Sequence, residues 1–199
     1  EGILKHLDWF FRKAEVRLNA RVFVVKGQPA SEVIAKGASK NKFLHERLQN
    51  LVENQGHHSI LTDVDLIEIM YIENMQEKSL CLTYIEMINT SEIGGSYDSE
   101  AMEIKAGGLC FIDGDRLAGY LDEKKSRGVN WLRNELGTGI LNIHSPSGSK
   151  ISSEFVDKKV KIIPKKENGK LSINIKIMLT VAVTEIQSTE NIFKEDTLK

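Results

Sequence analysis

Residues 107–141, GGLCFIDGDRLAGYLDEKKSRGVNWLRNELGTGIL, decide the fold that the sequence predicts for the second half of the chain. Two short apolar runs, 109–112 and 117–121, flank Asp113-Gly114, a dipeptide that tolerates the positive φ of a hairpin turn. Asp122 offers a carboxylate to cap a helix, which we expect to run to about Leu136 and to stop at Gly137. The segment therefore predicts strand, turn, strand, helix and strand.

The strongest strand pattern lies further along the chain. Apolar residues occupy every second position from Leu171 to Val183, and this alternation predicts a long strand with one face on a core. Asn168-Gly169 is a strong hairpin signal that joins this strand to residues 158–163. We expect a further strand over residues 139–143.

The first half of the chain predicts helices and two strands. Thr62-Asp63-Val64-Asp65 is a variant capping box, so we expect a helix to begin at Thr62. The continuous apolar run in residues 21–26 predicts a strand buried on both faces. The other expected elements are helices over 2–14, from Pro29 to Lys36 and over 41–55, and strands over 80–88 and from 101 into the opening segment.

These elements predict an α+β fold in two small domains. Residues 17–92 form a β-α-α-α-β unit, and residues 101–199 form a mostly antiparallel sheet with one packed helix. The polar segment 93–100 contains Gly94-Gly95 and is the expected linker.

Composition excludes two classes of function. The formal net charge of −1 argues against a nucleic-acid binder, which usually carries a basic excess. No apolar run approaches the roughly 20 residues that span a membrane. Charged residues at 28% and hydrophobic residues at 41% fit a globular domain.

No group of residues has the spacing of a catalytic or metal site. His57-His58, with Asp63 and Asp65 nearby, is the one cluster that hints at a metal, but adjacent histidines project in different directions. We interpret it as a loop followed by a helix cap, and we expect no enzyme activity, no metal and no cofactor. Cys81 and Cys110 each lie in an apolar run, which favours two buried free thiols; the alternative is a disulfide between them.

The lysines around residues 158–170 form a basic hairpin with two interpretations. They could attract anionic lipid headgroups, at about 1 kcal/mol per Lys near the surface. Alternatively, they form a solvated β-edge whose charges discourage aggregation. The candidate lipid patch comprises Lys158, Lys159, Lys161, Lys165 and Lys166.

The opening segment follows the pattern xGLxxFxxDxLxGxLxxxxxRGxxWL and resembles the C subunit of bacterial spore nutrient germinant receptors, the GerC-type lipoproteins or Ger(x)C family. Residues 17–27 with the helix from Pro29, and the Lys-rich strand pair, are similar to this family in pattern. The motif residues that we interpret as structural, with a partner-contact surface as the alternative, are Gly108, Asp115, Gly119, Tyr120 (where the family usually has Trp), Arg127, Gly128 and Trp131.

Three of these residues carry specific expectations. Gly128 lies inside the expected helix, where it costs about 1 kcal/mol relative to Ala, so we expect close packing against another backbone. Tyr120 on the preceding strand is the candidate for the facing surface. Trp131 is expected to anchor the core, and Arg127, four residues earlier, is placed for a cation–π contact with it.

The resemblance also implies a fragment. Family members carry a signal peptide that ends in a lipobox Cys, and they continue beyond the position of Lys199. Residues 1–16 are then the helical remnant of a truncated preceding domain, and the C-terminal domain is truncated as well.

The function that the resemblance implies is that of a non-catalytic lipoprotein subunit, which scaffolds or couples a germinant receptor. It would lie on the outer surface of the spore inner membrane, held there by a lipid anchor outside this fragment. Its partners would be the integral-membrane A and B receptor subunits. The alternative is an extracytoplasmic module that binds a small nutrient between its domains; a hydrolase is a weaker third interpretation.

Overall fold

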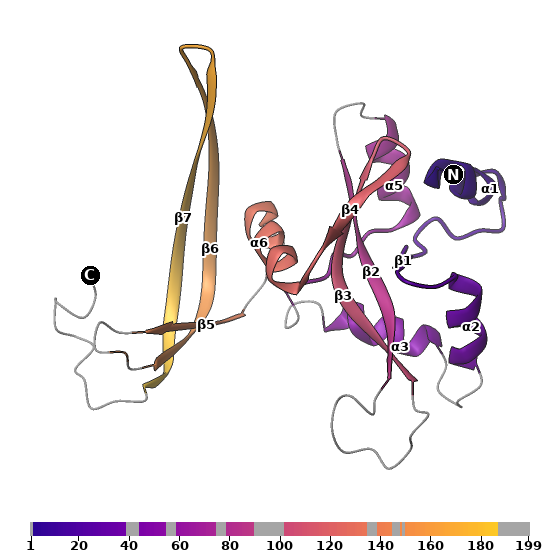
Figure 1. Cartoon of the computed structure of the whole chain (residues 1–199), viewed down its shortest axis with the longest axis horizontal. Coiled ribbons are helices and arrows are strands. Elements are labelled where there is room, and N and C mark those ends of the chain that lie inside the picture. The colour runs from indigo at the N-terminus through magenta and orange to yellow at the C-terminus, as the bar shows by residue number, and fades with distance from the viewer. Residues whose placement is uncertain are drawn as a thin grey trace. The chain divides into compact units, whose positions relative to one another are not determined.

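The computed structural model describes residues 2–38, 44–54, 59–74, 79–89, 102–134, 139–144, 148 and 150–186. The chain divides into two compact units, Glu1–Asn130 (unit 1) and Trp131–Lys199 (unit 2). Each unit contains its own sheet, as Figure 1 shows. The predicted α+β class is confirmed.

Unit 1 combines helices with a four-stranded sheet of order β1-β2-β3-β4. Its helices are α1 (Ile3–Arg12), α2 (Ala30–Ala38), α3 (Leu44–Glu53) and α5 (Leu66–Asn74), and its strands are β1 (Val24–Val25), β2 (Leu80–Asn89), β3 (Met102–Asp113) and β4 (Arg116–Leu121). Helix α6 (Glu123–Arg133) follows β4, and the boundary between the units falls within it.

Strands β2 and β3 form the centre of this sheet. They pair antiparallel from Leu80 opposite Ile112 to Asn89 opposite Met102. The predicted linker, residues 93–100, lies outside the described residues. Because the strands on its two sides pair with each other, they belong to one sheet, and the compact units divide further along the chain, after Asn130.

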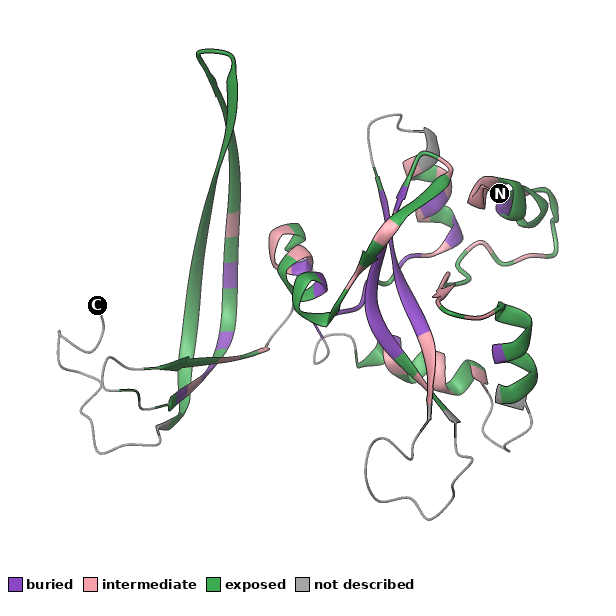
Figure 2. Cartoon of the chain, in the orientation of Figure 1, coloured by how far each residue is buried: buried purple, intermediate pink, exposed green. Residues whose placement is uncertain are grey.

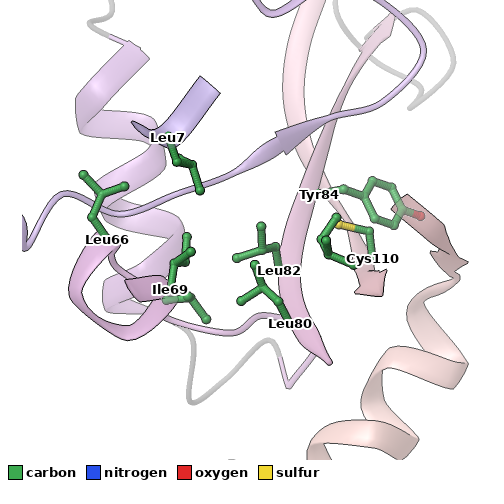
Figure 3. Packing of buried hydrophobic residues seen from close by; sticks show 9 residues of the cluster. Leu7, Leu66, Ile69, Leu80, Leu82, Tyr84 and Cys110 are labelled. Carbon is green, nitrogen blue, oxygen red and sulfur yellow. The ribbon is translucent and has the colours of Figure 1, made fainter. Parts of the chain in front are cut away.

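The core of unit 1 lies between β2 and two helices. Figure 3 shows Ile69 of α5 facing Leu80 and Leu82 of β2, and Leu7 of α1 and Leu66 of α5 belong to the same buried cluster. Leu82 is fully buried. The 3.6-residue spacing on the helices and the two-residue spacing on the strand bring these side chains onto facing surfaces.

Two expectations for unit 1 are wrong. The run at residues 21–26 is not buried on both faces: β1 comprises Val24–Val25, is half-buried, and lies at the edge of the sheet. The helix expected to begin at Thr62 is α5, which begins at Leu66. Asp65 caps α5 by accepting a 2.9 Å hydrogen bond from the Glu68 amide. The Thr62 amide instead donates to Oγ1 of Thr83 on β2, at 2.8 Å.

The local turn and cap signals are confirmed in most cases. Gly114 adopts φ +57° in the β3–β4 turn. Asp122 caps α6 by accepting a 2.9 Å hydrogen bond from the Lys125 amide, and this bond lowers the pKa of the Asp122 carboxyl. The helix ends earlier than expected, because Asn134 takes the left-handed conformation, at φ +63°.

Unit 2 contains an antiparallel sheet of order β5-β6-β7. Its strands are β5 (Gly139–His144), β6 (Lys150–Glu167) and β7 (Lys170–Ile186). Asn168 and Gly169 have φ values of +52° and +77°, which suit the predicted two-residue turn. The chain therefore forms a β6–β7 hairpin that is much longer than the part of β6 that pairs with β5 (Figure 1).

The expectation that β7 lies with one face on a core is wrong. Residues 161–185 are all exposed, and Figure 2 shows this along most of the hairpin. The alternating apolar residues from Leu171 to Val183 keep 38–71% of their surface accessible. The pattern predicted the strand correctly because alternation gives a strand two different faces. The apolar side chains of β7 nevertheless stay exposed in the described structure.

Candidate functional site

Gly108 is the motif residue with the strictest steric requirement. Its φ is +140°, and a Cβ atom there would meet the Leu121 carbonyl oxygen, with Oγ of Ser126 at 2.6 Å. The Ser126 hydroxyl accepts a 2.9 Å hydrogen bond from the Leu109 amide and donates one of 3.1 Å to the Leu121 carbonyl. Gly108 therefore allows the start of α6 to lie directly against β3.

Asp115 connects the β3–β4 turn to helix α1. Its carboxylate accepts a 2.6 Å hydrogen bond from the Leu4 amide, and its carbonyl accepts one of 2.9 Å from the Ile3 amide. Gly2, at the N-cap position of α1, makes no side-chain cap. Asp115 satisfies amides that a helix start otherwise leaves unpaired, although it is distant in sequence.

Tyr120 belongs to a cluster of two tyrosines and a lysine. Its ring makes an edge-to-face contact with Tyr84, at 5.0 Å between centroids. Nζ of Lys26 lies 4.7 Å from the Tyr84 centroid and 5.3 Å from that of Tyr120. Partial burial raises the pKa of the Tyr120 hydroxyl. The Tyr84 hydroxyl donates a 2.8 Å hydrogen bond to the Gly107 carbonyl, which ties this cluster to the motif.

Gly119, Arg127 and Gly128 are motif residues without a steric role in the described structure. The expectation that Gly128 packs against another backbone, with Tyr120 facing it, is wrong: Gly128 is exposed, and a Cβ atom there would meet nothing within 4 Å. A Cβ atom at Gly119 would also meet nothing within 4 Å. Arg127 is exposed as well.

Replacing Gly128 with Ala is expected to stabilise the protein by about 0.5–1 kcal/mol, because Ala loses less conformational freedom in a helix. Urea denaturation followed by circular dichroism measures this gain. Gly114→Ala is the matched control. A Cβ at Gly114 also meets nothing within 4 Å, but its φ of +57° disfavours Ala, so we expect a loss of stability. A loss in Gly128→Ala would contradict the described environment of α6.

Asn130 is a buried residue that the sequence reasoning missed. Its side-chain amide donates hydrogen bonds to the carbonyls of Ser59, at 3.2 Å, and Leu61, at 2.8 Å. Its Oδ1 atom has no hydrogen-bond partner. Ser126 and Asn130 are both fully buried and lie four residues apart on α6, so the buried side of this helix is polar. Apolar periodicity in the sequence therefore does not identify the buried side.

Trp131 is the first residue of unit 2 and packs on the sheet of that unit. Its ring contacts Phe155 of β6, at 5.0 Å between centroids. The cation that the structure places over Trp131 is Lys158, whose Nζ lies 5.5 Å from the ring centroid and 3.3 Å from the Trp131 carbonyl oxygen. The expected partner, Arg127, is an exposed residue on the unit 1 side of the boundary.

Lys158 is therefore wrongly placed in the candidate lipid patch. It is only 8% exposed: its ammonium group lies over the Trp131 ring and reaches a carbonyl near the end of α6, where a positive charge is favoured. Lys159, Lys161, Lys165 and Lys166 are exposed. They do not share one face: the register places Lys159, Lys161 and Lys165 on one side of the hairpin and Lys166 on the other.

Cys81 and Cys110 are both buried, and no disulfide joins them. Cys81 lies opposite Phe111, and Cys110 lies opposite Leu82, so regular pleating directs the two side chains to opposite faces of the sheet. Burial raises the pKa of the Cys110 thiol to about 12. The register therefore disfavours a disulfide between Cys81 and Cys110.

His57 and His58 lie outside the described residues. Among the residues that the structure does describe, no group of three His, Cys, Asp or Glu side chains could hold a metal ion. No helix in the described ranges has the length and apolar character needed to cross a membrane.

Comparison with known proteins places this arrangement in a family. The model described as "Spore germination protein N-terminal domain" matches residues 1–87, and "Spore germination B3/ GerAC like, C-terminal" matches residues 106–199. The crystal structure of the GerBC protein is similar, with a TM-score of 0.64 and 20% identity over 97% of this chain and 52% of that chain. No curated protein matches.

The fold is therefore a two-unit α+β architecture of the kind seen in GerBC. The chain belongs to the family of GerAC-like spore germination proteins, since the two family models together cover both of its halves. It spans about half the length of the GerBC chain that it matches.

Proposed function

We propose that this chain is part of the C subunit of a spore nutrient germinant receptor and acts there as a non-catalytic scaffold that couples nutrient sensing to germination. The observation that carries the proposal is the match of both halves of the chain to spore germination families. The motif contacts support a scaffold, because Asp115 and Ser126 are engaged in backbone hydrogen bonds and Trp131 packs on Phe155.

The proposal includes a location and partners. The subunit is a lipoprotein on the outer surface of the spore inner membrane, held by an anchor outside these residues. It associates there with the integral-membrane A and B subunits. The exposed faces and strand edges of the two units are the surfaces available for such contacts.

Co-isolation from spores tests the assembly. A tagged full-length protein should purify from detergent-solubilised inner membranes together with the A and B subunits, and a strain that lacks it should lose the response to the nutrient of that receptor. A tagged lipoprotein of another family controls for non-specific recovery. Recovery without either integral subunit, or an unchanged nutrient response in the deletion strain, would contradict the receptor assignment.

Calorimetry separates the scaffold from the nutrient-binding alternative. Titration of amino acids and sugars that trigger germination into the purified chain should give no binding heat beyond dilution. Micromolar binding would replace the scaffold with a nutrient-binding module. Chain unfolded in urea is the control for non-specific heat.

A further inference from the structure

The turn of the β6–β7 hairpin consists of Asn168 and Gly169, the one Asn-Gly dipeptide in the sequence. Strand β6 ends at Glu167, β7 begins at Lys170, and these two residues form the closing pair of the ladder. Asn168 and Gly169 therefore lie outside the ladder, at the end of the hairpin distant from β5 (Figure 1).

The surroundings of this turn leave it free to open. Asn168 and Gly169 are both exposed, and a Cβ atom at Gly169 would meet no described atom within 4 Å. A loop with so few buried contacts opens locally at a small cost in free energy. We therefore expect the peptide unit between Asn168 and Gly169 to rotate out of the turn conformation without unfolding of the strands.

An Asn-Gly dipeptide has an intrinsic reactivity, and Asn is a chemically labile residue. The amide nitrogen of the Gly attacks Cγ of the Asn side chain and closes a five-membered succinimide ring. The bond from Cγ to Nδ2 breaks, and the amide proton leaves with Nδ2 as ammonia. Water then adds to one of the two ring carbonyls, which gives aspartate or isoaspartate. Gly favours the attack because it has no Cβ to hinder it and rotates freely.

We propose that Asn168 is a site of spontaneous deamidation, in which the Gly169 amide is the nucleophile and water is the only co-reactant. The reaction takes place within one dipeptide of this chain. It does not depend on which element covers the apolar side of the hairpin, and it is independent of the function proposed above.

The two products have different consequences for the hairpin. Isoaspartate routes the main chain through Cβ and Cγ of residue 168, which lengthens the turn by one backbone atom. A two-residue turn has a fixed backbone twist, so the pair of Glu167 with Lys170 cannot keep its geometry. Aspartate leaves the main chain unchanged, and Asp-Gly is itself a favoured turn dipeptide. We expect isoaspartate to loosen the closing pair and aspartate to retain it.

The β3–β4 turn provides a comparison within the same chain. Asp113 and Gly114 are exposed there as well. The next residue, Asp115, is held by hydrogen bonds from the amides of Ile3 and Leu4, so opening of this turn would disrupt its contact with α1. Asp113→Asn would give this turn the same dipeptide, and we expect it to react more slowly there.

Mass spectrometry of the intact chain tests the proposal. The folded chain is incubated at mildly alkaline pH, and chymotrypsin then releases residues 156–171, in which Asn168 is the single Asn. We expect the mass of this peptide to rise by the difference between a carboxyl and an amide group, with isoaspartate and aspartate as separable products. A sample digested before incubation corrects for reaction during digestion.

Two other asparagines are matched controls in the same sample. Asn134 is exposed and shares the left-handed conformation, with φ +63°, but Glu follows it. Asn174 is exposed on the same hairpin, but it lies in the ladder and Ile175 follows it. Deamidation of Asn168 should be at least tenfold faster than that of either control.

Two further measurements separate the structure of the turn from the chemistry of the dipeptide. In Asp113→Asn, residue 113 should react at least tenfold more slowly than Asn168 of the same molecule. A synthetic peptide of residues 163–173 gives the rate without the hairpin, and the folded chain should react within about tenfold of it. Circular dichroism and the urea midpoint verify that Asp113→Asn is folded; if it is not, the comparison with the peptide decides.

Four results would overturn the proposal. Intact Asn168 in the folded chain after the peptide has reacted would show that the turn protects it. Equal rates at Asn134, Asn168 and Asn174 would mean that no particular site exists. Aspartate without isoaspartate would exclude the succinimide. Equal rates at residues 113 and 168 of Asp113→Asn would refute the part that the free turn plays.

Discussion

Asn130→Asp is expected to destabilise the protein by about 3–5 kcal/mol at pH 7, although it changes a single group of similar size. The Asn130 side-chain amide donates to the carbonyls of Ser59 and Leu61 and is fully buried. An ionised carboxylate there would face two carbonyl oxygens without a donor. A loss of this size is a large fraction of the 5–15 kcal/mol that stabilises a typical domain.

The loss should depend on pH in a defined direction. Burial disfavours the charged form, so the folded state raises the pKa of the introduced carboxyl above the ordinary value of about 3.9. The deficit relative to the unaltered chain should be smallest below pH 3.9, where the neutral acid can still donate to one carbonyl. It should grow as pH rises, by up to about 1.4 kcal/mol per unit, until pH passes the folded pKa.

Urea unfolding at several pH values measures this deficit as a difference from the unaltered chain, which cancels background titration. Asn142→Asp is the control, because Asn142 is exposed and its Oδ1 only accepts a 2.9 Å hydrogen bond from Ser152. Its effect should stay within about 0.5 kcal/mol at every pH. A deficit in Asn130→Asp that does not change with pH would argue against the buried amide described here.

Gly108→Ala is the second change with a large expected effect, a loss of about 3–5 kcal/mol. A φ of +140° strains any residue with a Cβ, at a cost of about 1–3 kcal/mol. Overpacking against the Leu121 carbonyl and Ser126 adds about 1–3 kcal/mol, since a backbone group cannot rotate away as a side chain can. The shift in urea midpoint and in melting temperature measures the loss.

Gly119→Ala on the paired strand β4 is the matched control. It introduces the same methyl group within the same motif, but nothing lies within 4 Å of its Cβ position, so the change should stay within about 0.5 kcal/mol. Gly108→Ala combined with Ser126→Ala should recover only part of the loss, because the Leu121 carbonyl stays in place. Equal effects of Gly108→Ala and Gly119→Ala would refute the close approach of α6 to β3.

The features that could be predicted from the sequence are those that depend on neighbouring residues. The Asn168-Gly169 turn and the Asp122 cap follow from backbone preferences over a few positions. The strand over β7 follows from the apolar residues at every second position up to Val183, because the pleat of a strand has a period of two residues. These signals also supported the α+β class. They carried no information on which face another element covers, and so the exposure of β7 was not foreseen.

The features that could not be predicted depend on residues distant in the chain. Thr62 has the side chain of a helix cap, but its amide and carbonyl bond to Thr83 on another strand, and the cap moves to Asp65. In the sequence Lys158 is one of several lysines expected at the surface, but in the structure its ammonium group contacts the Trp131 carbonyl. Local sequence does not specify such contacts, because the partner is fixed by tertiary packing.

The β6–β7 hairpin has a consequence for the order of folding. Its pairs begin at Glu167 and Lys170 and spread outward from the turn, so each new contact closes only a small additional loop. Isolated hairpins form in about 1–10 µs. The parallel pair of Val24 with Tyr84 must close a far longer loop. We therefore expect the hairpin to form early and reversibly, and to persist only once its apolar side is covered.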